Sequence, residues 1–532
     1  MSRHVDGSRI AHLGTAAGPI GLGLLAVAVY RTTLLPGVGW WDTAEFQTVG
    51  PLLGTAHPTG YPSYVVLGWL ASAVLAPVGE PAVRMNLLSA ILVAVAVAGT
   101  AVAATILTGR SWLGLVAGAG LALTPGVWAI STAADPHALH LALVAGLLVV
   151  LLRWEVLVRQ GEPSAERWLF AAAGLGGVAV GNHGLTVLLA PWLVVFVLVV
   201  DPGLLRRPRL LAACLGLGVA VAGALYLELP LRAGPFRAPL VYGHPERLDG
   251  FLAVVLGSQF AGAVRSPVGD PAGVGAAIAA AMTAEFGPLA VLLPVAVLTT
   301  VLRRSSFALL SLPAAALTAV FAASYENAEI GRYYLGPVLF GWLWLAVLGD
   351  FAAERLEPLL AAGSAPGPGG RRAPVVATPM AALVAALLLG PVLVAAPATR
   401  AAVDRSDDTS AARWLDAVLP VLAPDAVVVS WWSVSTPLWY AQLVEGRRPD
   451  VWVVDDRTRL DADLGEVTDV IDANLRERPV YVIRASAVEL AALAAAYELE
   501  PLAVPVDDPP WRVLRPRTAG GSTAPQAGDR PW

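Results

Sequence analysis

The chain has 532 residues, of which 56% are hydrophobic and only 14% charged, and 35 basic residues face 40 acidic ones. A soluble globular protein carries about 25% charged residues, so this composition excludes a cytosolic enzyme, a secreted disulfide scaffold and a nucleic-acid-binding protein. Residues 85–109 and 111–130 contain no charged side chain, and each run reaches the ~20 residues that a membrane-spanning helix needs. The sequence therefore predicts a mainly α-helical, polytopic membrane protein.

The apolar segments predict eleven transmembrane helices, at residues 13–35, 85–108, 111–130, 138–152, 168–181, 184–200, 210–230, 286–302, 306–323, 334–350 and 379–397. One more apolar segment, residues 61–75, is shorter, and we expect it to lie in the outer membrane interface. The positive-inside rule supports this topology. With a cytoplasmic N-terminus, fourteen arginines fall in inner loops and seven in outer loops, whereas a spanning 61–75 changes these numbers to eight and thirteen. We expect a multi-pass protein of the plasma membrane.

The predicted topology divides the chain into a transmembrane module, residues 1–399, and a different kind of sequence that follows it on the outer side. Residues 36–84 form the first large outer loop of the module. In residues 400–515, the strand-like segments 426–430, 451–455 and 480–484 alternate with amphipathic helical ones. That alternation predicts an extracytoplasmic α/β domain with a mainly parallel sheet. Residues 516–532 are rich in Gly, Pro and Ser, and we expect a disordered tail.

The first outer loop has the densest set of polar residues. Asp42-x-x-Glu45 has the spacing of a capping box, in which each carboxylate would bond to the backbone at the start of a helix. Acidic groups beside a bilayer are also typical of functional sites. The two interpretations are compatible. His57 and Tyr61 follow in the same loop, and a structural role in a turn is the alternative to a binding role for His57.

Several motifs together resemble a known family. Residues 41–46, WDTAEF, and 52–64, LLGTAHPTGYPSY, are similar to the opening motif of a family of polytopic membrane proteins that includes a vertebrate protein O-mannosyltransferase. Further matching motifs follow at Arg84-x-Asn86, residues 134–140, residues 181–183 and residues 437–451. The sequence departs from the family pattern at Thr43-Ala44 and at Ser433-Val434.

The resemblance implies the GT-C fold, whose glycosyltransferases use a sugar on a lipid phosphate and place acidic residues in the first and second outer loops. Asp42 and Asp135 fall in these two loops under the topology derived from arginine counts. By resemblance, Asp42 is the catalytic base, and Glu45 orients either Asp42 or the acceptor. The residues that we expect to bind substrate are His57, Tyr61, Asp135, His137, His183, Arg332, Arg232 and Arg237.

Among these residues, Arg332 is the main candidate for binding the lipid phosphate, because a guanidinium offers a planar pair of donors. Snorkelling at a helix end is the alternative. Arg232 and Arg237 are the weaker candidates, and for His183, as for His57, a structural role in a turn is the alternative.

The predicted function is transfer of a sugar, expected to be mannose, from a polyprenyl phosphate to a hydroxyl on the outer face, with inversion. Protein Ser/Thr is the favoured acceptor, and a glycan or lipid hydroxyl is the alternative. A transporter or flippase and a non-catalytic scaffold are alternatives of another class. The sequence has no Gly-rich phosphate loop, so we expect no nucleotide cofactor. It has no suitably placed Asp-x-Asp in the first two outer loops and no His-x-x-x-His pair on one helix face, so we expect no metal.

Overall fold

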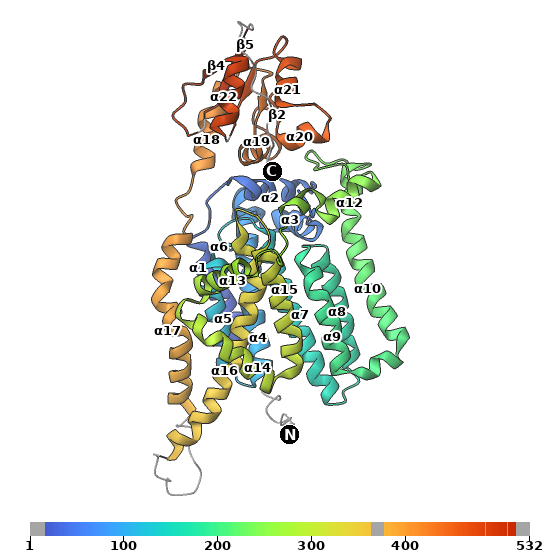
Figure 1. Ribbon diagram of the computed structural model, residues 1–532, viewed down its shortest axis with the longest axis vertical. Coiled ribbons are helices and arrows are strands. Elements are labelled where there is room, and N and C mark those ends of the chain that lie inside the picture. Colours follow the sequence, from blue (N-terminus) through green and yellow to red (C-terminus); the bar gives the residue numbers. More distant parts are fainter. Residues whose placement is uncertain (1–15, 363–376, 485, 508, 518–532) are drawn as a thin grey trace. The chain divides into compact units, whose positions relative to one another are not determined.

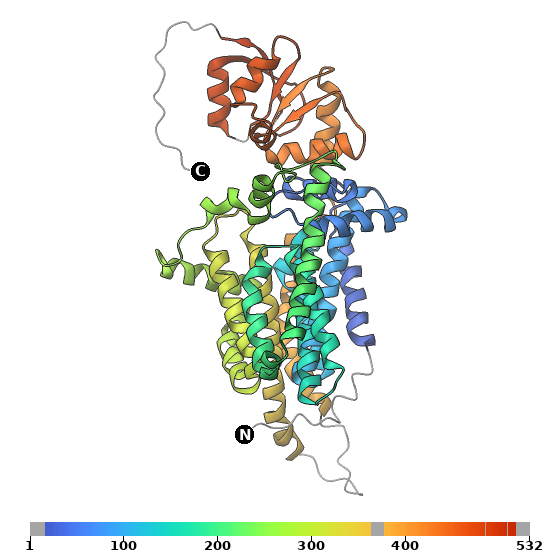
Figure 2. The same cartoon turned by 90° about the vertical axis from the view of Figure 1, so that its right-hand side faces the viewer.

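The computed structural model describes residues 16–362, 377–484, 486–507 and 509–517. Contacts between Cα atoms divide the chain into two compact units. The first contains residues up to Leu34, Leu87–Tyr226 and Ala263–Ser406, and the second contains Leu35–Asn86, Leu227–Gly262 and the residues from Asp407 onward. Figures 1 and 2 show the elements of both. The tail predicted for residues 516–532 lies outside the described residues apart from 516 and 517.

The first unit is helical. Its α-helices are α1 (Ala17–Arg31), α4 (Pro81–Thr108, which starts in the second unit), α5 (Ser111–Leu123), α6 (Pro125–Ala129), α7 (Pro136–Arg159), α8 (Ala165–Val180), α9 (Leu185–Val200), α10 (Pro208–Tyr226), α13 (Pro271–Phe286), α14 (Leu293–Arg303), α15 (Ser305–Ala323), α16 (Leu335–Ala362) and α17 (Ala377–Val403). Short 3₁₀ turns are η3 (Pro202–Arg206), η5 (Gly287–Leu292) and η6 (Ile330–Tyr334). In its described residues, each of the eleven apolar segments predicted from the sequence contains helix.

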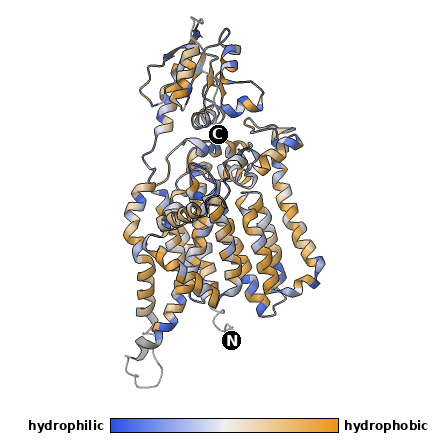
Figure 3. Ribbon diagram, in the orientation of Figure 1, coloured by the Kyte–Doolittle hydropathy of each residue, from blue (hydrophilic) through white to orange (hydrophobic). Residues whose placement is uncertain are grey.

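Among the described residues, seven helices are long and apolar enough to cross a membrane. They are Pro81–Thr108, Pro136–Arg159, Pro208–Ala233, Pro271–Arg303, Ser305–Ala323, Ile330–Glu357 and Pro379–Val403, and Figure 3 colours the long helices of this unit mostly as hydrophobic. The chain is therefore a multi-pass membrane protein. Helices α1, α5 and α9 are apolar but shorter, and α8 has only 16 residues, so the count of eleven spans stays a prediction.

Glycines allow close helix packing in the first unit. A Cβ atom on Gly120 of α5 would lie 2.2 Å from the Trp342 ring of α16, and the Trp342 indole donates a hydrogen bond to Thr124 at 2.9 Å. An ion pair joins α16 to the residue before α5: Arg110 contacts Asp350 at 2.8 Å and Glu357 at 2.6 Å. Glycine and other small residues let transmembrane helices approach closely.

The second unit joins three stretches of sequence. The first loop forms α2 (Trp41–Leu52), α3 (Pro62–Val74) and η2 (Ala76–Val78), and residues 227–262 add α11 (Glu228–Ala233), α12 (Leu248–Leu256) and most of η4 (Ser258–Ala263). The predicted helix at 61–75 is thus present as α3, with 13 residues. Asn86 holds the loop by donating to the Leu35 carbonyl at 2.9 Å and accepting from Gln47 at 2.8 Å.

The C-terminal part of the second unit is an α/β fold. It contains α18 (Ser410–Val418), η8 (Leu419–Val421), β1 (Val427–Val429), α19 (Trp432–Leu443), β2 (Trp452–Val454), α20 (Asp456–Asp461), α21 (Val467–Asn474), β3 (Val480–Val482), α22 (Ala487–Ala496), β4 (Tyr497–Pro501) and β5 (Trp511–Pro516). The strand order is β2-β1-β3-β5-β4. Helices of the same domain lie beside the sheet (Figure 2).

The expectation of a mainly parallel sheet is wrong for half of the strand pairs. Strand β1 pairs in parallel with β2 and β3, whereas β5 is antiparallel to both β3 and β4. Strands β4 and β5 were not predicted, because their charged residues and prolines hide the strand pattern. A short connection joins them, and only antiparallel strands can be joined without a long crossover.

Alternate residues of the sheet face two hydrophobic cores. Val428 and Tyr481 pack with the side chains of α18 and α19 on one face, whereas Val427, Val429 and Val482 pack with α21 and α22 on the other. This alternation follows from the two-residue period of a strand. The packing on the first face holds α19 against the sheet, just after the carboxyl end of β1. It thereby fixes the positions of the two tryptophans at the start of that helix.

Candidate functional site

Asp42 and Glu45 lie on α2, but they do not form a capping box. The helix begins at Trp41, its N-cap residue is Trp40, and no side chain caps it. Asp42 is therefore already inside the first turn, where a carboxylate is favoured by the helix dipole. Glu45 is 1% exposed and turns toward His57 instead of toward the N-terminus of the helix. The capping-box interpretation is wrong, because the helix starts two residues earlier than that pattern requires.

Glu45 and His57 form a buried pair. The backbone N–H of His57 donates to Glu45 Oε1 at 2.7 Å, and His57 Nδ1 contacts the other carboxylate oxygen. Burial raises the pKa of Glu45, while the charge and hydrogen bonds of His57 oppose this rise. The negative charge of Asp42 raises it further. Glu45 thus fixes the loop that carries His57.

Aromatic rings enclose His57. Tyr61 Oη lies 3.4 Å from His57 Nε2, and the ring centroids of Phe46 and Tyr61 lie 5.6 Å and 5.2 Å from that of His57. The rings of Tyr242, Phe260 and Trp432 also lie around it, at 6.5 Å, 6.4 Å and 5.9 Å. The structure therefore brings together four of the predicted residues, Asp42, Glu45, His57 and Tyr61.

Trp432 belongs to this site and was missed from the sequence. Its indole Nε1 donates a hydrogen bond to Asp42 Oδ1 at 2.9 Å. The neighbouring Trp431 packs edge-on against Trp41, with ring centroids 4.8 Å apart. A signal was present, because these tryptophans directly follow a buried strand and ligands bind at the carboxyl ends of parallel strands. We call Asp42, Glu45, His57, Tyr61 and Trp432 the first-loop cluster.

Three members of the first-loop cluster could hold a metal. One ligand atom from each of Asp42, Glu45 and His57 lies within 4.8 Å of the other two. Carboxylate and imidazole ligands suit divalent ions such as Zn²⁺ or Mn²⁺. A metal would have to compete with the bond between Glu45 and His57. The expectation that the protein needs no metal stays a prediction.

Asp135 and Arg332 pair directly in the first unit. Asp135 is the N-cap of α7 and accepts from the His137 backbone N–H at 2.7 Å, with the His137 ring Nδ1 2.9 Å from the same oxygen. Arg332 Nη1 donates to its other oxygen at 3.2 Å, and Nη2 contacts Glu329. Although burial disfavours its charge, Arg332 and His137 hold the pKa of Asp135 well below its usual range.

Two histidine rings lie next to this ion pair. The centroids of His137 and His183 are 4.6 Å apart, and Tyr333 lies 5.2 Å from His137. His183 Nδ1 accepts from the Leu185 N–H at 3.1 Å, so it has the turn-forming contact that the sequence offered as its alternative. We call Asp135, His137, His183 and Arg332 the arginine cluster. With a side-chain exposure of 12%, Arg332 is not snorkelling.

The other two candidate arginines bind backbone. Arg232 donates to the carbonyls of Leu53 and Leu52, at 2.7 Å and 3.2 Å, and Arg237 donates to the Ala233 carbonyl at 2.9 Å. These bonds give Arg232 a structural role, because it covers the otherwise unpaired carbonyls at the end of α2. The predicted substrate-binding role of Arg232 and Arg237 rests on the sequence alone.

The fold is that of the GT-C glycosyltransferases, which are membrane-embedded enzymes. ArnT from Cupriavidus metallidurans, bound to undecaprenyl phosphate, has a TM-score of 0.57 and 16% identity, and the match covers 93% of this chain and 97% of that one. The oligosaccharyltransferase AglB from Archaeoglobus fulgidus, in complex with an inhibitory peptide and a dolichol-phosphate, has a TM-score of 0.53 and 14% identity, covering 88% of this chain and 69% of that one.

Part of the chain is similar in sequence to one family of protein O-mannosyl-transferases. Residues 42–203 match the family model of the Protein O-mannosyl-transferase TMEM260 N-terminal domain. The chain is 28% identical over 265 residues to Protein O-mannosyl-transferase TMEM260 of Mus musculus. This match covers 47% of the chain and spans about a third, 36%, of the mouse protein. The resemblance to this family is confirmed in the part that contains Asp42, Glu45, His57, Asp135 and His183.

Proposed function

We propose that the protein is a membrane glycosyltransferase that moves a sugar, mannose by resemblance, from a polyprenyl phosphate to the hydroxyl of a protein Ser or Thr. The observation that carries the proposal is the first-loop cluster, in which Trp432 orients Asp42 beside the buried pair of Glu45 and His57. The names of the similar proteins support the same class: an O-mannosyltransferase, and two enzymes whose structures contain a polyprenyl-type phosphate.

The proposed reaction is a single displacement. The acceptor oxygen attacks the anomeric carbon, its proton passes to the Asp42 carboxylate, and the bond between that carbon and the phosphate oxygen breaks. Polyprenyl phosphate leaves with the bonding electrons, and the anomeric centre inverts. Because phosphate is a good leaving group, the reaction needs one base and a cation more than it needs an acid. Glu45 would keep the loop and Asp42 in place.

Arg332 is our candidate for the cation that stabilises the phosphate. Its second partner, Glu329, is 62% exposed in its side chain, and an exposed ion pair contributes little free energy. Exchange of Glu329 for a phosphate would therefore need little energy, while the bond to Asp135 keeps the guanidinium in place. We further propose that the C-terminal domain is extracytoplasmic, the N-terminus cytoplasmic and the location the plasma membrane.

A reconstituted assay tests this proposal. The purified protein in lipid is incubated with a panel of radiolabelled polyprenyl-phosphate sugars and with peptides that contain Ser or Thr. We expect transfer of mannose to peptide in the wild type and loss of transfer in Asp42→Asn. Transfer only to a glycan or lipid would change the acceptor class. Movement of the labelled lipid across the bilayer without any transfer would indicate a flippase, and neither activity would indicate a scaffold.

A further inference from the structure

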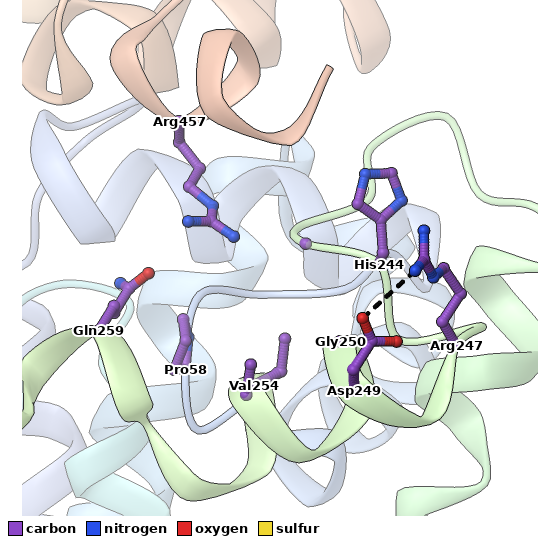
Figure 4. A pocket seen from close by; sticks show the side chains of 10 residues that line it. Pro58, His244, Arg247, Asp249, Gly250, Val254, Gln259 and Arg457 are labelled. Atoms are coloured by element: carbon purple, nitrogen blue, oxygen red, sulfur yellow. Dashed lines mark hydrogen bonds and ion pairs between the residues drawn. The ribbon is translucent and has the colours of Figure 1, made fainter. Parts of the chain in front are cut away.

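A cavity of about 180 Å³ lies in the second unit, beside the loop that carries His57. Pro58, the next residue of that loop, forms part of its wall, and α12, η4, α20 and the loop before α12 supply the rest. The polar residues of the wall are His244, Arg247, Asp249, Gln259 and Arg457 (Figure 4). None of these five is part of the first-loop cluster, so the cavity is a separate feature of this unit.

Arg457 of α20 offers the cavity a fixed positive charge. Its guanidinium lies over the Tyr242 ring, 4.7 Å from the centroid, and pairs with Asp461 at 2.5 Å. The structure gives the guanidinium no other hydrogen-bond partner among the described residues. A guanidinium has five N–H donors, so it can accept a further anionic partner without giving up Asp461. In Figure 4 the Arg457 side chain extends from α20 toward the cavity.

A second basic group lies across the cavity. Arg247 is 3.3 Å from Asp249, and both side chains are largely exposed, at 68% and 74%. The nearby His244 is held by two bonds, from Nε2 to the Asp461 carbonyl at 2.6 Å and from Nδ1 to Glu246 at 3.0 Å. Because an exposed ion pair contributes little free energy, an anionic ligand can replace Asp249 as the partner of Arg247.

The orientation of α12 indicates where the ligand comes from. Leu248, Leu252 and Leu256 are exposed on one face of this helix, which suits burial in the membrane interface. Asp249, Gly250 and Ala253 line the cavity from its other face. At about 100° per residue the centres of these two sets lie about 110° apart around the helix. The cavity-lining residues therefore lie beside the leucine face and not on it, which favours a water-borne ligand over a lipid phosphate.

Tyr242 connects the cavity with the first-loop cluster. Its hydroxyl donates to Gln259 of the cavity wall at 2.9 Å, and its ring lies 5.9 Å from that of Trp432. Trp432 in turn donates to Asp42. A group bound in the cavity would thus be separated by one aromatic side chain from the residue that orients the proposed base. This is a suitable place for a side chain that flanks the reacting hydroxyl.

We propose that this cavity binds a carboxylate side chain of the acceptor polypeptide, so that the enzyme prefers a Ser or Thr with an Asp or Glu nearby in its sequence. Arg457 would make the main ion pair, and Arg247 would contribute the second. The inference rests on the proposed function, because it assumes a polypeptide acceptor.

The first test measures binding alone. Fluorescently labelled Ser peptides, identical except for Asp or Asn beside the Ser, are titrated against the purified full-length protein in the absence of donor. Since hydrogen bonds to charged groups are strong, we expect the Asp peptide to bind about tenfold more tightly. Arg457→Gln should bring this ratio close to one. Asp249→Asn should raise it, because it removes the competing carboxylate. Arg515→Gln is the matched control, an exposed arginine paired with Glu498.

The outcomes separate the two proposals. Equal affinities of both peptides in the wild type, or no measurable binding of the Asp peptide, overturn the cavity assignment. So does an Arg457→Gln variant that binds polyprenyl phosphate more weakly but keeps its preference for the Asp peptide. In a parallel transfer assay, sugar transfer without a preference overturns the cavity assignment alone. A binding preference that depends on Arg457, without transfer to either peptide, supports the cavity and contradicts the proposed function.

Discussion

The indole N–H of Trp432 donates to a carboxylate oxygen of Asp42 at 2.9 Å, although 390 positions separate the two residues. A hydrogen bond to an ionised carboxylate is stronger than one between neutral groups. This bond fixes the rotation of the Asp42 side chain, on which a general base depends. The C-terminal α/β domain therefore contributes directly to the first-loop cluster.

Asp42→Asn should abolish transfer and leave the protein intact. Asn keeps the oxygen that accepts from Trp432, but it cannot take the acceptor proton. Loss of a positioned general base lowers the rate by about 10²–10⁴-fold. Rates at saturating donor, with expression level as the stability readout, check this prediction, and the exposed Asp407→Asn is the control. If Asp42→Asn transferred sugar at the wild-type rate, another residue would have to be the general base, and Asp135 would be tested next.

Trp432→Phe should slow transfer while preserving the fold. The phenyl ring retains most of the packing against His57 and Tyr242, but the N–H donor to Asp42 is lost. A hydrogen bond to a charged group contributes about 1.5–3 kcal/mol, so the rate should fall at least about tenfold. Trp452→Phe, on the far side of the same domain's sheet from α19, is the control. An unchanged rate would assign Trp432 to packing alone.

Glu45 should set the acid side of the pH–rate profile. Because burial raises its pKa, Glu45 takes up a proton at a higher pH than an ordinary glutamate as the pH falls. Protonation weakens its bonds to His57, so transfer should decline at that pH. In Glu45→Gln the rate should be lower, by about tenfold, and its acid-side decline should move to lower pH. A profile identical to that of the exposed control Glu477→Gln would contradict this role.

Arg332→Ala should affect both stability and use of the donor. It leaves the buried Asp135 with one charged partner fewer, and breaking a buried pair costs about 3–5 kcal/mol. Adding Asp135→Asn should recover much of the thermal stability, since Asn keeps the N-cap of α7 without the charge. If Arg332 binds phosphate, the donor KM stays high in this double variant. Recovery of the donor KM together with stability would show that Arg332 acts only through Asp135.

Cysteine labelling tests the predicted orientation. Cys214 is the only cysteine of the chain, so its replacement by Ala gives a clean background. Single cysteines at the exposed positions Asn327 and Asp407 should react with an impermeant thiol reagent applied outside intact cells. Cysteines at the exposed positions Glu162 and Arg209 should react only after the membrane is opened. The reverse pattern would contradict the predicted topology and the outer location of both clusters.

The sequence by itself determined the helices and four of the five residues of the first-loop cluster. Charge-free runs such as residues 85–109 are helical because a bilayer offers no partner for an unpaired backbone N–H or C=O. Asp42, Glu45, His57 and Tyr61 lie within 20 positions of one another, and a single local motif carried them. The three strands β1, β2 and β3 were also predicted, since each is a short, β-branched run between turn residues.

Only the tertiary structure decided which distant groups complete each cluster. Trp432 reaches Asp42, and Arg332 reaches Asp135, across hundreds of positions, and no local pattern encodes such a contact. The capping-box spacing of Asp42 and Glu45 predicted a backbone role, yet Glu45 bonds to His57. With this local sequence, the Glu45 carboxylate could either cap the helix backbone or bond to His57. Burial decides between them, because a buried carboxylate needs its partners more than a helix end exposed to water needs a cap.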